Sequence, residues 1–473
     1  MNAASALRTD VPAAGAESVP ARSAHFGASW LPWVVAGLLA LVLVWRIVVV
    51  NVSAYFAQEA VTTPAAAARG VAWDGGNGEA LLREAATRID RDPVRARELA
   101  DQALLANPAS ARAYLVLAYI ADVSGDTRAY AAALARSAEL EPQNAPTRLA
   151  LAELALRQND AEGALVNMDA AIRARPAVAI DLYPQMLALL GTAAGETALR
   201  KQFARQIPAW WPDFLSYAAG HADTVIAPLR LLDIRRNFDP SPGVLERQPV
   251  VARLAKEGEW QPALFVWLNG LSPEQRRAAG NVHNGSFEAG FTATTFDWRW
   301  PSHNGVEVEA LPTFGTSGVR AMRLAFQGQV ASPQLIAQTL LLDPGYAYDL
   351  RARYRLESLR TQFGLQWEIS CGAAGSTKVL AEGERLVGTN DWRDSIVKFA
   401  VPADCYPQQL ALVLRGNARL DLQASGLAWF DDMQVIRGIA LGVSKPGSAS
   451  ESTSPTQAGG GAGSRKTNSR YRE

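Results

Sequence analysis

An interval of 34 residues recurs through the first half of the chain. Three prolines and three aspartates keep this interval: Pro108, Pro142, Pro176, Asp92, Asp126 and Asp160. Between successive prolines lie two apolar runs, separated by a turn at Gly125 in one unit and at Asn159 in the next. Within each run the apolar residues are three or four positions apart, which places them on one face of a helix. The interval therefore predicts a repeated pair of helices, because Gly ends the first helix and Pro prevents the second from continuing.

This unit of two helices resembles the tetratricopeptide repeat, which has the same length and small residues where its helices cross. Ala118 and Ala152 occupy such positions one interval apart. A single pair cannot bury its own apolar face, so about three units must stack to be stable. We interpret residues 79–176 as these repeats and residues 177–280 as degenerate repeats that extend the same α-solenoid.

The resemblance also implies a function for the repeats, since stacked helix pairs bind an extended peptide or a partner's helix on their inner surface. Arg112, Tyr114, Asn144 and Arg148 lie on or beside the first helices and are candidates for this surface. The alternative is that these four side chains are simply solvated.

An apolar stretch from Trp30 to Val50, interrupted by Arg46, precedes the repeats. It is long enough to cross a bilayer about 30 Å thick, and we predict a single transmembrane helix over residues 30–56. Residues 1–29 are then a disordered N-terminal arm and residues 57–78 a linker. A cleavable signal peptide is the competing interpretation. Because its apolar region would be shorter and closer to the start, we favour a retained anchor.

Charge near the span favours one orientation. Arg8 and Arg22 precede it, whereas Arg69 alone follows closely, which places the N-terminus in the cytoplasm. Arg46 argues weakly for the opposite orientation, although a long side chain near the end of a span reaches the interface. We therefore expect a single-pass protein of a bacterial inner membrane, with the bulk of the chain in the periplasm.

The hydrophobic period changes from 3.6 to 2 near residue 281. Apolar and polar residues alternate over 346–356 and over 363–370, and turns recur between such segments. Several short alternating strands predict an antiparallel β-sandwich over residues 281–437, followed by a disordered tail at 438–473.

Three segments of this domain carry a second resemblance: Asn284–Glu288, Leu341–Tyr346 and Trp429–Val435. Their order is similar to that in the jelly-roll carbohydrate-binding modules of families 4, 9 and 22, within the galactose-binding-like superfamily. The resemblance implies a jelly roll that binds a saccharide. It also implies a structural calcium, for which Glu288 and Asp432 match the carboxylate positions; hard oxygen ligands suit this ion.

Three arginines on one predicted strand, Arg351, Arg353 and Arg355, project to the same side. We expect Gln366 and Glu368, with Arg323 and Lys398, to join them on one face, where bidentate contacts would bind an acidic glycan. The alternative is a solvated face neutralised by nearby acids. Trp298 and Trp300 are candidates for stacking on a sugar ring, or else form an apolar plug at the end of the sandwich.

Cys371 and Cys405 are the only cysteines, and both lie in the predicted sandwich. They would form a disulfide in an oxidising compartment, or remain two separate buried thiols. Spacing alone leaves these alternatives open.

Lys plus Arg and Asp plus Glu number 46 each, so a zero net charge gives no indication of nucleic-acid binding. No catalytic motif such as a nucleophile elbow, phosphate loop or paired zinc histidines occurs, so we expect no enzymatic activity. The modules together predict a membrane-anchored accessory protein of cell-surface polysaccharide biosynthesis, assembly or export. The first alternative is a protein-only assembly scaffold whose sandwich packs on protein, and the second is a glycan-processing enzyme.

Overall fold

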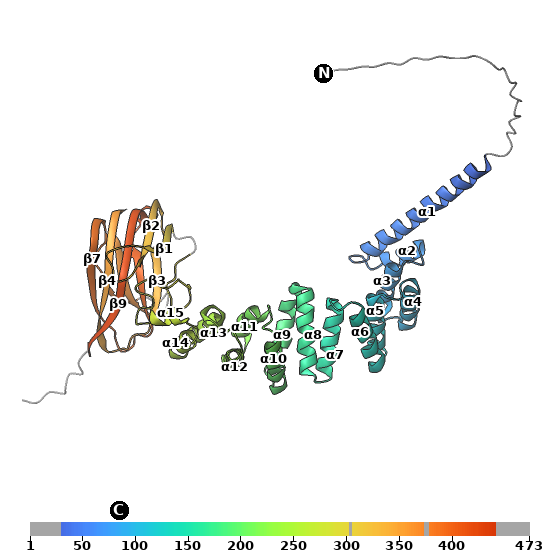
Figure 1. Cartoon of the computed structure of the whole chain (residues 1–473), viewed down its shortest axis with the longest axis horizontal. Coiled ribbons are helices and arrows are strands. Elements are labelled where there is room, and N and C mark those ends of the chain that lie inside the picture. The colour runs from blue at the N-terminus through green and yellow to red at the C-terminus, as the bar shows by residue number, and fades with distance from the viewer. Residues whose placement is uncertain (1–29, 302–304, 373–377, 441–473) are drawn as a thin grey trace, which may run out of the picture. The chain divides into compact units, whose positions relative to one another are not determined.

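The computed structural model describes residues 30–301, 305–372 and 378–440, and the chain divides into two compact units between Leu182 and Tyr183. Figure 1 shows helices up to α15 and strands from there onward. The predicted disordered arm and nearly all of the predicted tail lie outside the described residues.

The first unit is helical. Its helices are α1 (Leu31–Glu59), α2 (Ala66–Trp73), α3 (Gly78–Arg88), α4 (Pro93–Ala106), α5 (Ala111–Val123), α6 (Thr127–Leu140), α7 (Ala145–Arg157) and α8 (Ala161–Ala174). Helices α3 and α4, α5 and α6, and α7 and α8 pack as pairs, and each pair also contacts the next. The helix pairs predicted from the 34-residue interval are therefore present. Their assignment to the tetratricopeptide family stays a prediction.

The aspartates that recur every 34 residues begin the second helix of each pair. The side chains of Asp92, Asp126 and Asp160 accept the N–H groups of residues 95, 129 and 163. Each such N-cap contributes about 1 kcal/mol, because it satisfies a backbone donor at the helix start. Gly125 and Asn159 both have positive φ, 74° and 57°, so Asn keeps the left-handed turn that Gly makes one unit earlier.

One helix among the described residues, α1, is by itself long and apolar enough to cross a membrane. Most of its side chains are exposed, but Val49, Ser53 and Ala57 near its end are buried. These residues belong to the part of α1 that packs on α2 and α3. The apolar helix is thus continuous with the first helices of the repeat region.

Further helices lead to the sandwich: α9 (Ala179–Leu190), α10 (Ala193–Arg205), α11 (Trp211–His221), α12 (Ile226–Arg235), α13 (Val244–Lys256), α14 (Trp260–Leu268) and α15 (Pro273–Arg277). Helices α13 and α14 pack on each other. Trp267 of α14 is buried and donates a hydrogen bond from Nε1 to Thr294 Oγ1 at 2.8 Å, which ties α14 to the entry of the sandwich within the second unit.

The strands are β1 (Val306–Pro312), β2 (Arg320–Val330), β3 (Gln334–Leu340), β4 (Tyr346–Thr361), β5 (Leu365–Cys371), β6 (Lys378–Glu382), β7 (Gly388–Ala400), β8 (Gln408–Leu414) and β9 (Gln423–Ala440). They form a five-stranded sheet in the order β1-β2-β9-β4-β7 and a four-stranded sheet in the order β3-β8-β5-β6. Every pairing between these strands is antiparallel. The predicted antiparallel sandwich is confirmed.

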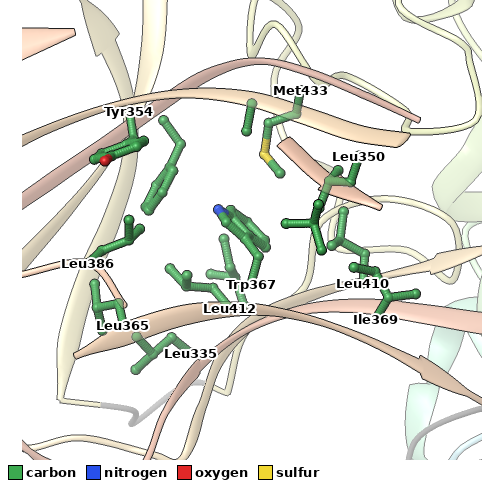
Figure 2. Close-up of a cluster of buried hydrophobic side chains, with 14 of the residues drawn as sticks. Leu335, Leu350, Tyr354, Leu365, Trp367, Ile369, Leu386, Leu410, Leu412 and Met433 are labelled. Carbon is green, nitrogen blue, oxygen red and sulfur yellow. The ribbon is translucent and has the colours of Figure 1, made fainter. Parts of the chain in front are cut away.

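Apolar side chains from both sheets meet in the core, with Trp367 at its centre in Figure 2. The Trp367 ring lies edge-on to Phe430 of the opposite sheet, with centroids 5.1 Å apart. Because strands alternate their faces, Leu365, Trp367 and Ile369 point inward and the residues between them point outward. Each large side chain buried in this way contributes roughly 1.5–3 kcal/mol.

Candidate functional site

The three predicted arginines lie on β4, the strand between β9 and β7 in the five-stranded sheet. Arg351 lies 3.9 Å from Asp349, Arg353 lies 3.3 Å from Asp394, and Arg355 lies 2.9 Å from Glu357. Arg323 on β2 pairs with Glu309 at 2.7 Å. Local acids thus neutralise this outer face, which favours the alternative of an ordinary solvated surface over an anion-binding one.

Two tryptophans contact Arg355: Trp429, the first residue of a segment noted in the sequence, and Trp392, which the sequence pattern did not single out. The guanidinium carbon of Arg355 lies 4.7 Å from the ring centroid of Trp429 and 5.4 Å from that of Trp392. The neighbouring Arg353 donates a hydrogen bond to the carbonyl of Gly315 at 2.7 Å. Arg353 and Arg355 therefore connect the sheet to the loop above it. Their guanidinium groups already interact with acids, aromatic rings or a backbone carbonyl of the protein.

Gln366 and Glu368 do not share the face of the arginines, and that prediction is wrong. Both lie on β5 of the four-stranded sheet, whereas Arg351, Arg353 and Arg355 belong to the five-stranded one. Alternation placed each residue correctly within its own strand, but it contains no information on which sheet a strand joins.

The outer face of the four-stranded sheet is polar with small side chains at its middle. Register places Ala337 of β3, Ala411 of β8 and Glu368 of β5 in one row across the strands. The next row consists of Thr339, Gln409 and Ser370. Ala337, Ala411 and Val413 form an apolar cluster of their own, separate from the core. We call this surface, from Ala337 to Glu382 of β6, the polar face.

Part of the polar face is already paired. Arg415 binds both Glu368 and Glu382, which joins β5 to β6 at one side of the surface. Gln366 donates a hydrogen bond from Nε2 to the carbonyl of Gly383 at 3.1 Å. At the other side the Nη2 of Arg299 donates to Thr339 Oγ1 at 3.0 Å, while burial lowers the pKa of Arg299.

Two side chains in the middle of the polar face have no protein partner. The Gln409 amide and the Ser370 hydroxyl make no hydrogen bond to any residue in the described part of the chain. Gln409 could donate two hydrogen bonds and accept others, and a hydroxyl can do both. Both side chains and the adjacent Ala411 are buried, with Gln409 5% and Ser370 1% exposed. Their amide and hydroxyl groups match the hydroxyl groups of a ligand. The alternation over residues 363–370 indicated an outward position for Ser370, but nothing in the sequence pointed to Gln409.

Trp298 cannot stack on a sugar, because it is fully buried. Its Nε1 donates to the carbonyl of Asn284 at 3.2 Å, and its ring packs on Phe287 and Trp367. Trp300 is half-buried and lies edge-on to Phe291, with centroids 5.3 Å apart. The apolar plug is the arrangement that the structure shows.

Glu288 and Asp432, the calcium candidates, both face the segment before β2. The Oε1 of Glu288 accepts the N–H groups of Val319 and Arg320, and Asp432 accepts that of Ser317 at 3.4 Å. Beside them Asp431 is fully buried with one oxygen unpaired. No group of three metal-ligating side chains is found in residues 30–301, 305–372 or 378–440. The donor set is thus incomplete, and calcium binding stays a prediction.

Burial raises the pKa of Asp431 to about 6, with further contributions from the negative charges of Asp432 and Glu288. The nearby Thr316 side chain and a hydrogen bond from the Asp432 backbone N–H act in the opposite direction. Three carboxylates thus share this end of the sandwich, where protonation of Asp431 relieves part of their repulsion.

All four peptide-binding candidates in the repeats have structural partners, Tyr114 through a side-chain hydrogen bond with Arg136. Arg112 pairs with Glu79 of α3 at 2.5 Å, and Asn144 caps α7. Arg148 donates to the carbonyl of Pro142 and to the side chain of Asn167. Tyr114 is half-buried on α5. Peptide binding by this surface stays a prediction.

Cys371 at the end of β5 and Cys405 before β8 form a disulfide, with their Cα atoms 5.4 Å apart. The bridge closes a loop of 34 residues between two neighbouring strands of the four-stranded sheet. Of the two alternatives that spacing left open, the structure contains the bridged one.

Comparisons with known proteins add little beyond this geometry. No family model and no curated protein matches the chain. Among solved structures, one described as "CBM4 structure and function" is 15% identical, with a TM-score of 0.27, and the match covers 33% of this chain and 99% of that one.

Two further structures match to a similar extent. The CBM22-1 xylan-binding domain of Paenibacillus barcinonensis Xyn10C is 13% identical, with a TM-score of 0.22 over 32% of this chain and 91% of that one. A putative sugar binding protein of Bacteroides thetaiotaomicron is 9% identical, with a TM-score of 0.25 over 34% and 100%. Similarity this low carries no argument about ligands, so the description of the sandwich rests on its own strands.

Proposed function

We propose that this chain is a membrane-anchored, non-catalytic accessory protein of cell-surface polysaccharide assembly or export. In this proposal the sandwich binds a saccharide on the polar face, and the helix pairs, as tetratricopeptide-like repeats stacked in a solenoid, bind a protein partner. The observation that carries the saccharide role is the unpaired Gln409 and Ser370 beside Ala411 on an otherwise ordered sheet.

Retention of α1 as an anchor is supported by its contacts with the folded unit. Ser53 is buried within α1, and its hydroxyl donates a hydrogen bond of 2.8 Å to the carbonyl of Gly70. Asn77, which caps α3, donates to the same hydroxyl at 2.9 Å. A helix removed as a signal peptide would take these partners with it. The first 20 or so residues of α1 remain to span about 30 Å of hydrocarbon.

A location outside the cytoplasm is supported by the disulfide between Cys371 and Cys405. Such bonds persist in oxidising compartments such as the periplasm and are rare where cellular thiols keep cysteines reduced. Together with the arginines before α1, this favours a cytoplasmic N-terminus and a periplasmic sandwich.

Saccharide binding on the polar face follows from the chemistry of its side chains. Amide and hydroxyl groups match sugar hydroxyls, which both donate and accept hydrogen bonds. Arg415 pairs with both Glu368 and Glu382, which leaves one negative charge, and Arg299 on Thr339 brings the sum over this face to zero. We therefore propose a neutral saccharide here, in place of the acidic glycan expected on the arginine strand.

The test is a glycan array probed with the full-length protein in detergent micelles. Retention of neutral oligosaccharides or polysaccharides supports the proposal. Ala411→Leu, which places a larger side chain between Gln409 and Val413 on β8, should abolish that retention. Arg351→Ala, on the other sheet, serves as the matched control and should leave it unchanged. Absence of retention of any glycan would favour a protein-only scaffold.

The scaffold alternative has an observation of its own. Phe314, in the loop above the arginine strand, is 93% exposed, and the neighbouring Val319 is also exposed. Trp392 donates from Nε1 to the carbonyl of Phe314, so the loop is held in place. An exposed aromatic side chain on a loop that is held in place can bind a pocket on another protein. Phe314→Ser should weaken capture of such a partner without changing glycan retention.

A further inference from the structure

A cavity of about 430 Å³ lies among α12, α13 and α14, in the helical part of the second unit. Its lining combines apolar side chains such as Leu229, Phe265 and Val266 with two arginines, Arg236 and Arg247, and one acid, Asp233. Neither the saccharide site nor the repeat surface uses these residues.

Arg247 is the unusual member of this lining, because it is only 7% exposed and has no acidic partner. Its Nε donates to the carbonyl of Pro242 at 2.9 Å. Its two terminal nitrogens make no hydrogen bond or ion pair with any residue that the structure describes. A buried charge costs free energy unless a counter-charge accompanies it.

The nearby acids are already engaged. Glu246 accepts a hydrogen bond of 2.6 Å from Trp211 Nε1 and lies 2.9 Å from the Nε of Arg235. Asp233 pairs with Arg236 at 2.9 Å. Three guanidinium groups therefore face two carboxylates, which leaves one positive charge uncompensated at Arg247.

The charges that act on Arg247 agree with an excess of one positive charge. Burial lowers the pKa of Arg247, and the positive charges of Arg236 and Arg235 act in the same direction while Glu246 opposes them. The guanidinium remains charged at any physiological pH. An anion in the cavity would relieve this cost.

The side chain of Arg247 is held by the backbone around it. A Cβ at Gly270 would lie 2.7 Å from Arg247 Cδ and 2.9 Å from Val244 Cα, so only glycine allows the segment after α14 to pass this close. Together with the bond to Pro242, this close packing fixes the stem of Arg247, which is one of the residues that line the cavity.

We propose that this cavity binds a monocarboxylate on an apolar body, with Arg247 forming the bidentate contact. A single negative charge matches the single uncompensated positive charge, whereas a phosphate dianion would leave an excess of the opposite sign. Phe265, 69% exposed, supplies an apolar wall with Leu229 and Val266. Two parallel N–H···O bonds from one guanidinium fit the geometry of a carboxylate.

The test measures binding to the full-length protein in detergent by isothermal titration calorimetry at constant ionic strength. Benzoate is expected to bind at one site, more tightly than acetate or inorganic phosphate. Arg247→Met should weaken benzoate binding at least about tenfold, since a charge-assisted hydrogen bond is lost. Arg247→Lys should retain part of it. Arg230→Met is the control, because Arg230 is an exposed arginine paired with Glu196 elsewhere in the unit, and it should change nothing.

Equal benzoate binding by the wild type and Arg247→Met overturns the proposal, and so does tighter binding of phosphate than of benzoate. Should Arg247→Met fail to fold, Phe265→Ala keeps the test intact, because this exposed side chain can be removed without opening the core. Phe265→Ala should weaken the binding of benzoate and leave the binding of acetate unchanged. A short peptide ending in phenylalanine, compared with its amidated form, then shows whether a chain terminus can supply the carboxylate.

Discussion

The hydroxyl of Ser53 in α1 donates a hydrogen bond of 2.8 Å to the carbonyl of Gly70 in α2, in a buried position. The same hydroxyl accepts from Asn77, so one side chain joins the apolar helix to α2 and to the start of α3. A helix that is long and apolar enough to cross a membrane thus ends inside the folded helical unit.

Removal of this hydroxyl should loosen the junction. Ser53→Ala leaves the carbonyl of Gly70 and the amide of Asn77 without their buried partner, at a cost of about 1–3 kcal/mol. We expect faster proteolysis between residues 57 and 78 in the full-length protein in detergent. Gly70→Ala should act similarly, since the new Cβ would lie 3.1 Å from Ala80 Cβ. Exposed Ser124→Ala in α5's C-terminal turn is the control, and equal proteolysis of all variants would contradict the account.

Reduction of the disulfide should destabilise the sandwich. For a closed loop of 34 residues, loss of the bridge between Cys371 and Cys405 should cost about 2–4 kcal/mol. Thermal unfolding followed with and without reductant measures the loss, and a double Cys→Ser variant should match the reduced protein. Identical melting temperatures in both conditions would argue that the bridge does not form.

The arginines of β4 should differ in their effect on stability. Arg355 lies between the rings of Trp392 and Trp429, so Arg355→Ala should lose roughly 1–2 kcal/mol. Arg351 has only a long contact of 3.9 Å with Asp349, and its substitution should cost less than about 0.5 kcal/mol. Denaturant unfolding of both variants is the measurement, and the reverse order would exclude a structural role for the tryptophan pair.

Acid should weaken the junction between α14 and the sandwich. Burial lowers the pKa of His283 from 6.5, with Asp297 opposing the shift, and Trp267 packs edge-on against the ring. Because the unfolded chain binds the proton more readily than the folded chain, stability is complete above pH 6.5 and falls as the pH decreases below it. His283→Phe should flatten this slope, which melting curves between pH 5 and 7.5 would show. If the pH dependence of the melting temperature is unchanged in His283→Phe, other titratable groups cause it.

Much of the fold could be predicted because its signals are local. The spacing of Asp92, Asp126 and Asp160 marks helix starts, and such N-caps depend on residues within one turn. The alternation in β4 and β5 likewise assigns each residue to a face of its strand. Local patterns of this kind predict the helix pairs, the apolar helix and the antiparallel sandwich.

The candidate site was harder to predict from the sequence, since it depends on which strands are neighbours in a sheet. Gln366 and Glu368 follow the arginines closely in sequence, but β5 joins the opposite sheet. Trp298 reads as a loop aromatic, yet it fills the core beside Trp367. Gln409 and Arg247 could not be identified from the sequence. They stand out only because no other side chain in the described part of the structure pairs with them, and the sequence does not show this.

The central claim is that the polar face around Gln409 and Ser370 binds a saccharide. The most direct measurement is affinity electrophoresis of the full-length protein in gels containing neutral polysaccharide, comparing the wild type with Gln409→Ala and Arg351→Ala. We predict that the wild type and Arg351→Ala are retarded equally and that Gln409→Ala loses most of the retardation. Equal retardation of all three proteins, or of none, would contradict the account.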